Sequence, residues 1–458
     1  MRGNILFICL AVFLQTNLFA QMQGLISYSS ERYSRAIQPE SNTVVVENYT
    51  DDTIITLCTD NNNTSYFCKI ALNSSAVEYG VMPSGIEIYD FKIYGNDIIM
   101  CGKNTNTTPL NPGFIGVINI NDLFAGIGIL QCHSVGHSNT VYDMEYYIDI
   151  NGHLKVAALA TTRPSGYIFV DYDLSTSTTH YIYPTQYTLY RLTQTKNYIA
   201  IVFSEPNATE FGIIRHDKAN IFNYQSQIWQ FAGGNVYSSF GLVPENRGTY
   251  FLIEDIEGTD EVCVVGTIRN HPGYIAGVPI VVYNIDVSNF NLNSTQVIQS
   301  YGKTKLKDME YIPTDQTLHI INNTDLYYNN NGNITYKFNI DLVNKIDVYP
   351  INLPYTAEVI IPSNSLEYNE YINSIIRYSD NYYIIGGKSS SFSSLYWFDR
   401  KYSNSNDQCY RSYGISVVQS NAFSAGNMTY SYYPHMADIT NISCPGVYNT
   451  LWFSQCID

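Results

Sequence analysis

Short apolar segments separated by polar turns recur along this chain. The sequence Asp-Met-Glu-Tyr occurs twice, at 143–146 and 308–311, and each copy begins a unit of strand, turn and strand. Weaker copies of the unit begin at 90, 254 and 374. Apolar residues in these units alternate with polar ones or form short runs, and no stretch of about 12 residues keeps the 3.6-residue period of a helix. The pattern therefore predicts strands and no long helix.

The repetition predicts how these strands are arranged. Units of several short strands that recur every 40 to 65 residues or so are typical of a β-propeller. We expect an all-β chain that forms a seven-bladed β-propeller of four-stranded antiparallel blades. The seven units span about 42–81, 86–132, 140–183, 187–231, 249–300, 306–350 and 371–419.

Three of the units resemble kelch-type repeats. The segments 98–102, 262–266 and 383–387 are apolar strands that end at glycine, the last of them in the pair Gly386-Gly387. The tryptophan that kelch repeats carry after the third strand is missing from these units. The resemblance implies a propeller. Because kelch-type propellers include both sugar-acting enzymes and pure binding modules, it does not choose between these functions.

The two ends of the chain lie outside the repeats. Residues 1–20 contain Arg2, an apolar run from Ile5 to Leu14 and a small residue, Ala20, before Gln21, which is typical of a secretory signal peptide. We expect residues 21–41 to lead into a propeller at 42–420 and residues 421–458 to form a tail that packs on it or closes it. The predicted location is secreted, periplasmic or cell-surface, with no membrane span.

Composition agrees with strands and excludes one class of partner. The chain has 42 Tyr and only 14% charged residues, a mixture that suits strands and turns better than helices. Its 40 acidic and 24 basic residues give a net charge of -16, without a dense basic cluster. Nucleic acid is therefore not an expected partner.

Cysteine spacing predicts one disulfide. Of nine cysteines, Cys9 lies in the signal peptide, so eight remain in an oxidising compartment. Cys58 and Cys68 flank a polar stretch that connects two predicted antiparallel strands, and we expect them to be bonded.

The other cysteines have no assignable partner. Cys101 and Cys132 are expected on the second and fourth strands of one blade, about 10 Å apart and too far for a bond unless Cys132 lies past the strand end. The pairing of Cys263, Cys409, Cys444 and Cys456 cannot be deduced, although the last three lie together near the end of the chain.

Four repeated aspartates are candidate site residues: Asp90, Asp143, Asp255 and Asp308. They fall on the predicted inner strands, where a ring of carboxylates could bind a ligand, hold Ca²⁺ or act as acid and base. The alternative is that each accepts a hydrogen bond between neighbouring blades. We favour the alternative because catalytic residues break the symmetry of a repeat, whereas these follow it.

Tyrosines beside the same strands, among them Tyr89 and Tyr142, could stack on sugar rings. They could equally cover half-buried blade faces, because tyrosine is a good strand residue. Cys132 and His133 with His137, and His435 with Asp438, have only loosely ligand-like spacing, so no metal or other cofactor is predicted beyond the possible Ca²⁺.

These features favour a non-catalytic binding module for a carbohydrate or a protein ligand. A propeller that cleaves carbohydrate with two carboxylates, as a hydrolase or lyase, is the first alternative. A structural scaffold of the cell envelope is the second.

Overall fold

The computed structural model consists of antiparallel β-sheets. It describes residues 33–39, 41–60, 62–71, 76–106, 112–162, 166–184, 187–204, 210–230, 235–236, 251–269, 280–298, 303–313, 317–330, 333–347, 355–360, 371–377, 382–389, 392–399, 410–415, 417–418, 425–426, 430–436, 439–443, 449–451 and 453–454. Within these residues there are seven sheets and one short helix. No helix in this part of the chain is long and apolar enough to cross a bilayer.

Each sheet is built mainly from strands that are consecutive in the chain. Sheet 1 contains β2 (Ser41–Thr50), β3 (Thr53–Asp60), β4 (Ser65–Ala71) and β5 (Ala76–Val81). Sheet 2 contains β6 (Ile86–Tyr94), β7 (Asp97–Asn104), β8 (Gly113–Asn119) and β9 (Ile129–Ser134). Sheet 3 contains β10 (Ser138–Ile148), β11 (Leu154–Thr162), β12 (Gly166–Asp173) and β13 (Thr178–Pro184).

The next three sheets follow the same order. Sheet 4 contains β14 (Thr188–Gln194), β15 (Tyr198–Ser204), β16 (Glu210–Asp217) and β17 (Asn220–Gln230). Sheet 5 contains β19 (Phe251–Asp255), β20 (Glu261–Arg269), β21 (Ile280–Asp286) and β22 (Asn291–Ile298), with β18 (Asn235–Val236) beside the far end of β20. Sheet 6 contains β23 (Lys303–Ile312), β24 (Thr317–Asn330), β25 (Asn333–Asp347) and β26 (Tyr355–Ile360).

Sheet 7 joins the two ends of the chain. It contains β27 (Tyr371–Arg377), β28 (Tyr382–Ser389) and β29 (Phe392–Asp399), and its fourth strand is β1 (Tyr33–Pro39), which pairs with β29. The sequence analysis placed residues 33–39 in a lead-in outside the repeats. Their pairing with β29 joins positions more than 350 residues apart, which no local pattern reveals.

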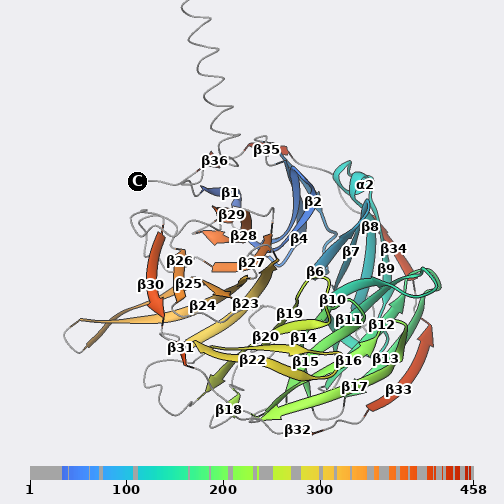
Figure 1. Ribbon diagram of the computed structural model, residues 1–458. Helices are drawn as coiled ribbons and strands as arrows, with labels where there is room; N and C mark the ends of the chain where they lie inside the picture. The colour runs from blue at the N-terminus through green and yellow to red at the C-terminus, as the bar shows by residue number, and fades with distance from the viewer. Residues whose placement is uncertain are drawn as a thin grey trace, which may run out of the picture.

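The end of the chain adds one more strand to the outside of every sheet. These strands are β30 (Tyr410–Ile415), β31 (Val417–Val418), β32 (Ala425–Gly426), β33 (Tyr430–Met436), β34 (Ile439–Ser443), β35 (Asn449–Leu451) and β36 (Phe453–Ser454). They join sheets 6, 5, 4, 3, 2, 1 and 7, in that order. Figure 1 shows β30 and β33 to β35, in orange to red, at the periphery.

The first strands of the sheets surround a common centre. Contacts join β2 to β6, β6 to β10, β10 to β14, β14 to β19, β19 to β23, β23 to β27 and β27 back to β2. The arrangement is an all-β, propeller-like fold, as Figure 1 shows.

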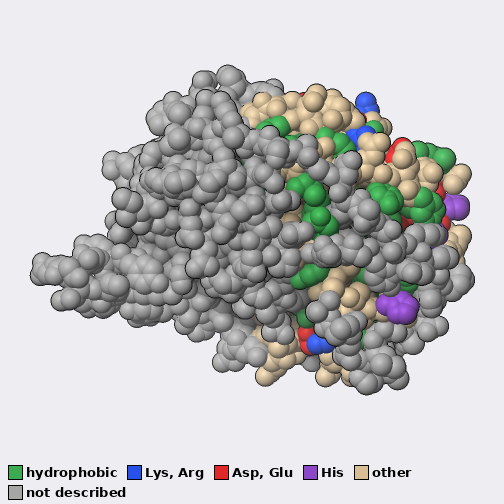
Figure 2. Space-filling model, turned by 90° about the horizontal axis from the view of Figure 1, so that it is seen from below, with side chains coloured by type: hydrophobic (Ala, Val, Ile, Leu, Met, Phe, Trp, Pro, Cys, Tyr) green, Lys and Arg blue, Asp and Glu red, His purple; other side chains and the backbone are tan. Residues whose placement is uncertain are grey.

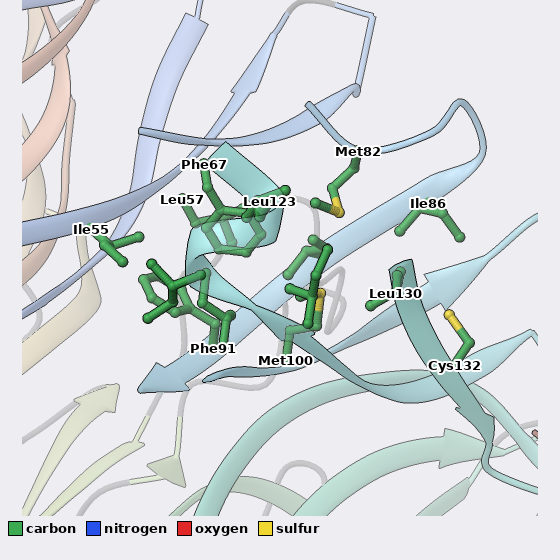
Figure 3. Close-up of a cluster of buried hydrophobic side chains, with 14 of the residues drawn as sticks. Ile55, Leu57, Phe67, Met82, Ile86, Phe91, Met100, Leu123, Leu130 and Cys132 are labelled. Atoms are coloured by element: carbon green, nitrogen blue, oxygen red, sulfur yellow. The ribbon is translucent and has the colours of Figure 1, made fainter. Parts of the chain in front are cut away.

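The hydrophobic core lies between neighbouring sheets. Between sheets 1 and 2, the fully buried Leu57 and Phe67 meet Phe91 and Met100, and the rings of Phe67 and Phe91 are 5.1 Å apart, edge to face (Figure 3). Leu123 from the short helix α2 (Ile120–Phe124) completes this cluster. Further clusters join sheets 2 and 3, 3 and 4, 4 and 5, and 5 and 6. Face-to-face burial of this kind holds the sheets against one another.

The glycine that ends the second strand of several units has a steric cause. Gly102 lies opposite Ile88, and a Cβ atom at Gly102 would come within 2.0 Å of the Glu87 carbonyl oxygen. The pairing register shifts just after Ile88, at a β-bulge. Similar shifts occur in β2, β10, β14, β23 and β27. A bulge bends the strand and redirects the side chains that follow it, here the residues that line the centre.

The predicted disulfide between Cys58 and Cys68 is absent. Both are buried and neither forms a disulfide, and their sulfur atoms are 3.9 Å apart. They lie on β3 and β4, the expected strands, but Cys58 pairs with Tyr66 and Cys68 with Thr56. The two cysteines are therefore diagonal neighbours, whose Cα atoms are typically 7 to 8 Å apart, beyond the usual reach of a disulfide.

Three other cysteines lie in the described residues, and the remaining ones do not. Cys101, Cys132 and Cys263 are buried and form no disulfide, and β8 separates Cys101 on β7 from Cys132 on β9, as expected. The positions 409, 444 and 456 lie outside the described residues.

Candidate functional site

A polar cavity of about 380 Å³ lies where the first strands meet. Residues from the first strands of all seven sheets line it. At one end the lining includes Leu252, Lys307 and Asn373, which are buried, and at the other it includes Asn48, which is exposed. The cavity therefore has a floor and a mouth. Its charged residues are Glu47, Asp90, Asp143, Glu145, Glu254, Asp255, Asp308, Glu310, Lys92, Arg191, Lys307 and Arg377.

The lining residues form two layers, which the strand register defines. The first layer is the residue that directly follows the bulge: Val45, Asp90, Asp143, Arg191, Asp308 and Ser374, with Leu252 at the matching position of β19. The second layer lies two residues further toward the mouth: Glu47, Lys92, Glu145, Thr193, Glu254, Glu310 and Ile376. Because side chains alternate along a strand, residues two apart point the same way.

The first layer joins neighbouring sheets by one repeated hydrogen bond. An oxygen in the side chain of one sheet accepts from the backbone N–H that follows the first-layer residue of the next sheet. The four bonds are Met144 N to Asp90 Oδ2 (3.3 Å), Leu192 N to Asp143 Oδ2 (2.7 Å), Ile375 N to Asp308 Oδ2 (3.0 Å) and Val46 N to Ser374 Oγ (3.2 Å). The predicted contact between blades is thus present for three of the four aspartates.

Two of these aspartates also bond to their own strand. Asp90 accepts from Phe91 N at 2.9 Å, and Asp308 accepts from Met309 N at 3.0 Å. In both cases the preceding sheet has an apolar first-layer residue, Val45 or Leu252, which offers no side-chain acceptor. The second carboxylate oxygen therefore accepts from the N–H of Phe91 or Met309, for which the preceding sheet offers no side-chain acceptor. Buried backbone N–H groups need such a partner.

Asp143 differs because its second oxygen binds a cation. Its Oδ1 accepts from Arg191 Nη1 at 2.6 Å, while Met144 N is already bonded to Asp90. Burial raises the pKa of Asp143 to about 6, against the opposing effect of Arg191. Burial alone would lower the pKa of Arg191, but Asp143 and Asp90 together raise it above its ordinary value.

The second layer places one lysine between two carboxylates. Lys92 Nζ lies 3.2 Å from Glu47 Oε1 and 3.0 Å from Glu145 Oε1, so it joins sheets 1, 2 and 3. Burial alone would lower the pKa of Lys92, but Glu145 and Glu47 together raise it well above its ordinary value. Burial raises the pKa of Glu145 to about 7 and also raises that of Glu47.

Sheets 5 and 6 present carboxyl groups in the same layer. Glu254 and Glu310 occupy matching positions on β19 and β23. Burial, and then the negative charge of Glu310, raise the pKa of Glu254 well above its ordinary value. Burial raises the pKa of Glu310 to about 8, although the backbone N–H of Arg377 donates to it. At neutral pH this wall therefore holds a protonated carboxyl group at Glu310, which can donate as well as accept hydrogen bonds.

These pKa values predict that stability falls as the pH rises from 6.5 to 8. The folded-state pKa of Glu310 is about 8 and that of Glu145 about 7, whereas both ionise near pH 4.3 when unfolded. The folded protein therefore retains protons that the unfolded chain has lost, and we expect unfolding free energy to decrease by roughly 1 kcal/mol per pH unit. Guanidinium unfolding at several pH values measures this.

Glu310→Gln provides the control. Because the amide does not titrate, the unfolding free energy of this variant should depend less steeply on pH. The pH window excludes the buried His133 and His216, whose pKa values burial lowers; above pH 6.5 they are mostly neutral in both states. Stability that is constant or increasing across the window would contradict the protonated carboxyl groups.

Two tyrosines lie close to the Lys92 cluster, although neither is among the described residues that line the cavity. The rings of Tyr94 and Tyr146 are 5.4 Å apart in an edge-to-face contact, and Tyr94 is 41% exposed. Tyr94 follows Lys92 by two residues, and Tyr146 directly follows Glu145. After burial, the charges of Glu145 and Glu47 raise the pKa of Tyr146, so its hydroxyl lies within electrostatic reach of the Lys92 cluster. An exposed aromatic face thus lies next to hydrogen-bonding groups.

Three residues predicted from the sequence lie outside the two layers. Asp255 is one residue beyond the second layer and accepts from Thr193 Oγ1 at 3.4 Å, so it does not match the other three aspartates. Tyr89 donates to Glu87 Oε2 at 2.6 Å, and Tyr142 donates to the Leu189 carbonyl at 2.6 Å. Neither tyrosine is among the described residues that line the cavity. Ligand binding by the aspartates and by these tyrosines stays a prediction.

Metal binding has no direct support in the described part of the chain. No group of three or more His, Cys, Asp or Glu side chains there has a geometry that could hold an ion. His133 is instead hydrogen-bonded through Nδ1 to the hydroxyl of Tyr172 at 2.5 Å. The side chains of His435 and Asp438 lie outside the described residues.

Sequence reasoning missed the second layer. Lys92, Glu145, Glu254 and Glu310 lie within the segments that were recognised as repeats, and Glu is the third residue of both Asp-Met-Glu-Tyr copies. The signal was therefore present two residues after Asp90, Asp143 and Asp308. This signal was overlooked because sheet 2 has Lys92 where the two Asp-Met-Glu-Tyr copies have Glu. Lys92 is nevertheless the residue that pairs with Glu47 and Glu145.

Charged side chains are concentrated in the central cavity. Figure 2 shows one face of the molecule on which the described side chains are mainly hydrophobic or uncharged. With only 14% charged residues in the chain, eight carboxyl and four basic residues in one cavity are a strong concentration.

Comparison with known proteins adds little to this description. No family model matches the chain, and no curated protein matches it. Among solved structures, the crystal structure of polysaccharide lyase Uly1 is similar with a TM-score of 0.41 and 8% sequence identity, over 78% of this chain and 90% of that chain. A likeness this distant carries no argument about the function.

Proposed function

We propose that this protein is an exported, closed seven-bladed β-propeller that binds a carbohydrate at the mouth of its central cavity without cleaving it. The carrying observation is the exposed ring of Tyr94, which contacts Tyr146, the residue that directly follows Glu145 of the Glu47–Lys92–Glu145 cluster. Sugars are recognised by an aromatic face that packs on their C–H groups and by polar groups that bond their hydroxyls. Export rests on residues 1–20 and is part of the proposal.

The size and polarity of the cavity support a small, hydroxyl-rich ligand. A volume of about 380 Å³ lies at the lower end of the range for small-molecule sites. The lining combines charged carboxylates, protonated carboxyl groups and cations, which together offer donors and acceptors. An apolar ligand would leave these groups without partners, at a cost of about 1 to 3 kcal/mol each.

The charges favour a neutral or amino sugar over an acidic one. Lys92, Arg191 and Arg377 are each already paired with a carboxylate. An acidic sugar would have to compete with these partners and would face the carboxyl groups of sheets 5 and 6. A neutral or positively charged ring avoids both costs.

Tyr94→Ala is expected to weaken carbohydrate binding by about 10- to 30-fold, because a stacking residue at a binding site contributes roughly 1.4 to 2 kcal/mol. A glycan array with the purified full chain identifies the ligand, and calorimetry measures the dissociation constants. Phe222→Ala is the matched control, since Phe222 is 44% exposed but lies on β17, away from the cavity.

Equal loss of binding in both variants, or none in either, would contradict the proposed site. An array without any bound glycan would contradict the proposed ligand class. Preferential binding of acidic glycans would overturn the charge argument while leaving the mouth as the site.

Carbohydrate cleavage is the second candidate function, and one observation favours it. Glu254 and Glu310 line the same cavity with raised pKa values, so a protonated acid and an ionised base could coexist there near neutral pH. Incubating the full chain with its array ligand and analysing the products by mass spectrometry distinguishes the two. Shortened glycans that disappear with Glu310→Gln would favour the enzyme, and an intact ligand would favour the binding module.

A further inference from the structure

The last strands of the chain, β30 to β36, run around the outside of all seven sheets. We call residues 410–454 the strap. Each of its strands pairs antiparallel with the outermost strand of one sheet: β26, β22, β17, β13, β9, β5 and β1, in chain order. The strap therefore visits every sheet once and ends on sheet 7, where β1 and β36 bring the two ends of the chain together.

Sheet twist explains why the sheets are met in reverse order. Neighbouring strands rotate by about 20 to 25°, so the fourth strand of a sheet is turned by roughly 60 to 75° from the first and runs largely around the rim. All the fourth strands then run around the rim in one sense. A segment that pairs antiparallel with each of them must travel in the opposite sense, which gives the order 6, 5, 4, 3, 2, 1, 7.

The length of the strap matches this path. Residues 410–454 supply between six and seven residues for each sheet, or about 20 Å of extended chain, which is the length of an ordinary strand. A segment of this length is long enough to pair once with the outer strand of each sheet.

Two prolines agree with the pairing of β33 on sheet 3. Pro434 pairs with His180, and Pro184 pairs with Tyr430, four residues along the ladder. Proline has no N–H, so it fits only where the backbone does not donate across the ladder, and such positions recur every second residue. Both prolines obey this spacing. Pro434 on the outermost strand also discourages a further strand from adding to the edge.

We propose that the strap is a lock on ring closure, which goes beyond the proposed function and does not depend on it. Separating any two neighbouring sheets would stretch the strap across the gap, so part of it must first detach. Because its partners are distant in sequence, it can dock only after the sheets have formed. Contacts that form late in folding mainly slow unfolding.

The strap is anchored unequally. Seven residue pairs hold β33 on sheet 3 and six hold β30 on sheet 6, whereas two pairs each hold β31, β32 and β36. Sheets 3 and 6 lie on nearly opposite sides of the proposed ring. Two strong points of attachment at such positions suffice to keep the ring closed.

A cysteine cross-link between the strap and sheet 3 tests the lock in the full chain. Tyr183 and Ser431 are directly paired, so Tyr183→Cys with Ser431→Cys should form a disulfide. The matched control joins Tyr183→Cys to Thr450→Cys, which lies on the strap at sheet 1 and should not cross-link. We expect the cross-linked protein to unfold in guanidinium at least 10-fold more slowly, with the wild-type rate restored by reductant.

Every other outcome would overturn the proposal. No cross-link in the matched pair, or equal cross-linking in both pairs, would show that the strap does not follow the stated order. A cross-link that leaves the unfolding rate unchanged would show a strap that is not a lock. Wild-type protein with and without reductant controls for the native cysteines. These readouts involve no glycan, so they stand apart from the test of carbohydrate binding.

Discussion

Lys92→Met is expected to lower the free energy of unfolding by about 2 to 3 kcal/mol at pH 7. The substitution keeps most of the side-chain volume but removes the cation that lies 3.2 Å from Glu47 and 3.0 Å from Glu145. Removing one partner of a buried pair costs about 3 to 5 kcal/mol, and the lower value applies because Lys92 is about a quarter exposed. Chemical denaturation followed by tyrosine fluorescence measures the change.

The pH dependence of this loss identifies its cause. Without Lys92, the pKa values of Glu47 and Glu145 should rise further, so both carboxyl groups are protonated more readily. A raised folded-state pKa contributes stability that is lost as the pH rises through it. The difference between variant and wild type should therefore be smaller at pH 5 than at pH 8.

Lys69→Met is the matched control. The Lys69 side chain is 26% exposed, almost the same as Lys92 at 27%, but it contacts one carboxylate, Glu78, at 3.1 Å on the outer part of sheet 1. An exposed pair of this kind contributes at most about 1 kcal/mol. Equal losses for the two methionine variants would mean that the Lys92 cluster is no more important than a surface ion pair.

Asp143→Ala should destabilise the protein more than Asp308→Ala. Both substitutions remove the acceptor of a backbone N–H on the next sheet, which costs about 1 to 3 kcal/mol, and Asp308→Ala also removes the local acceptor of Met309 N. Asp143→Ala also leaves Arg191 without its 2.6 Å partner, so its total loss should reach about 3 to 4 kcal/mol. The two denaturation midpoints, compared at one pH, measure the difference.

Arg191→Met in the Asp143→Ala background checks the explanation. If the additional loss comes from an unpaired guanidinium group, removing that group should recover part of the stability. Equal losses for the two alanine variants, without recovery in the double variant, would show that the ion pair contributes nothing and that the shared hydrogen bond accounts for both.

The aspartates show how far sequence reasoning reached into the site. Symmetry predicted a structural contact between blades, and Asp90, Asp143 and Asp308 make it. Asp255 was included because it follows the same apolar pattern, but Leu252 occupies the matching position of β19. A bulge changes the register by one residue, and the sequence alone does not show which residue is on which side of it.

The cysteines show a similar limit. Spacing placed Cys58 and Cys68 on adjacent strands of one hairpin, and this was correct. Whether they could bond depended on the register of the hairpin, and an offset of two residues changes a direct pair into a diagonal one. The number of residues between the two cysteines does not determine this register, because some of those residues belong to the paired strands and not to the turn.

By itself, the sequence determined the local structure: short strands, their antiparallel order within each unit and the small residues at their ends. These follow from patterns of a few residues, which the chain repeats many times. The tertiary structure decided what joins distant positions: β1 in sheet 7, the strap across all seven sheets and the charges that meet in the cavity. Such contacts depend on how twisted sheets pack around a centre, so residues far apart in the chain become neighbours without sharing any pattern that a single sequence displays.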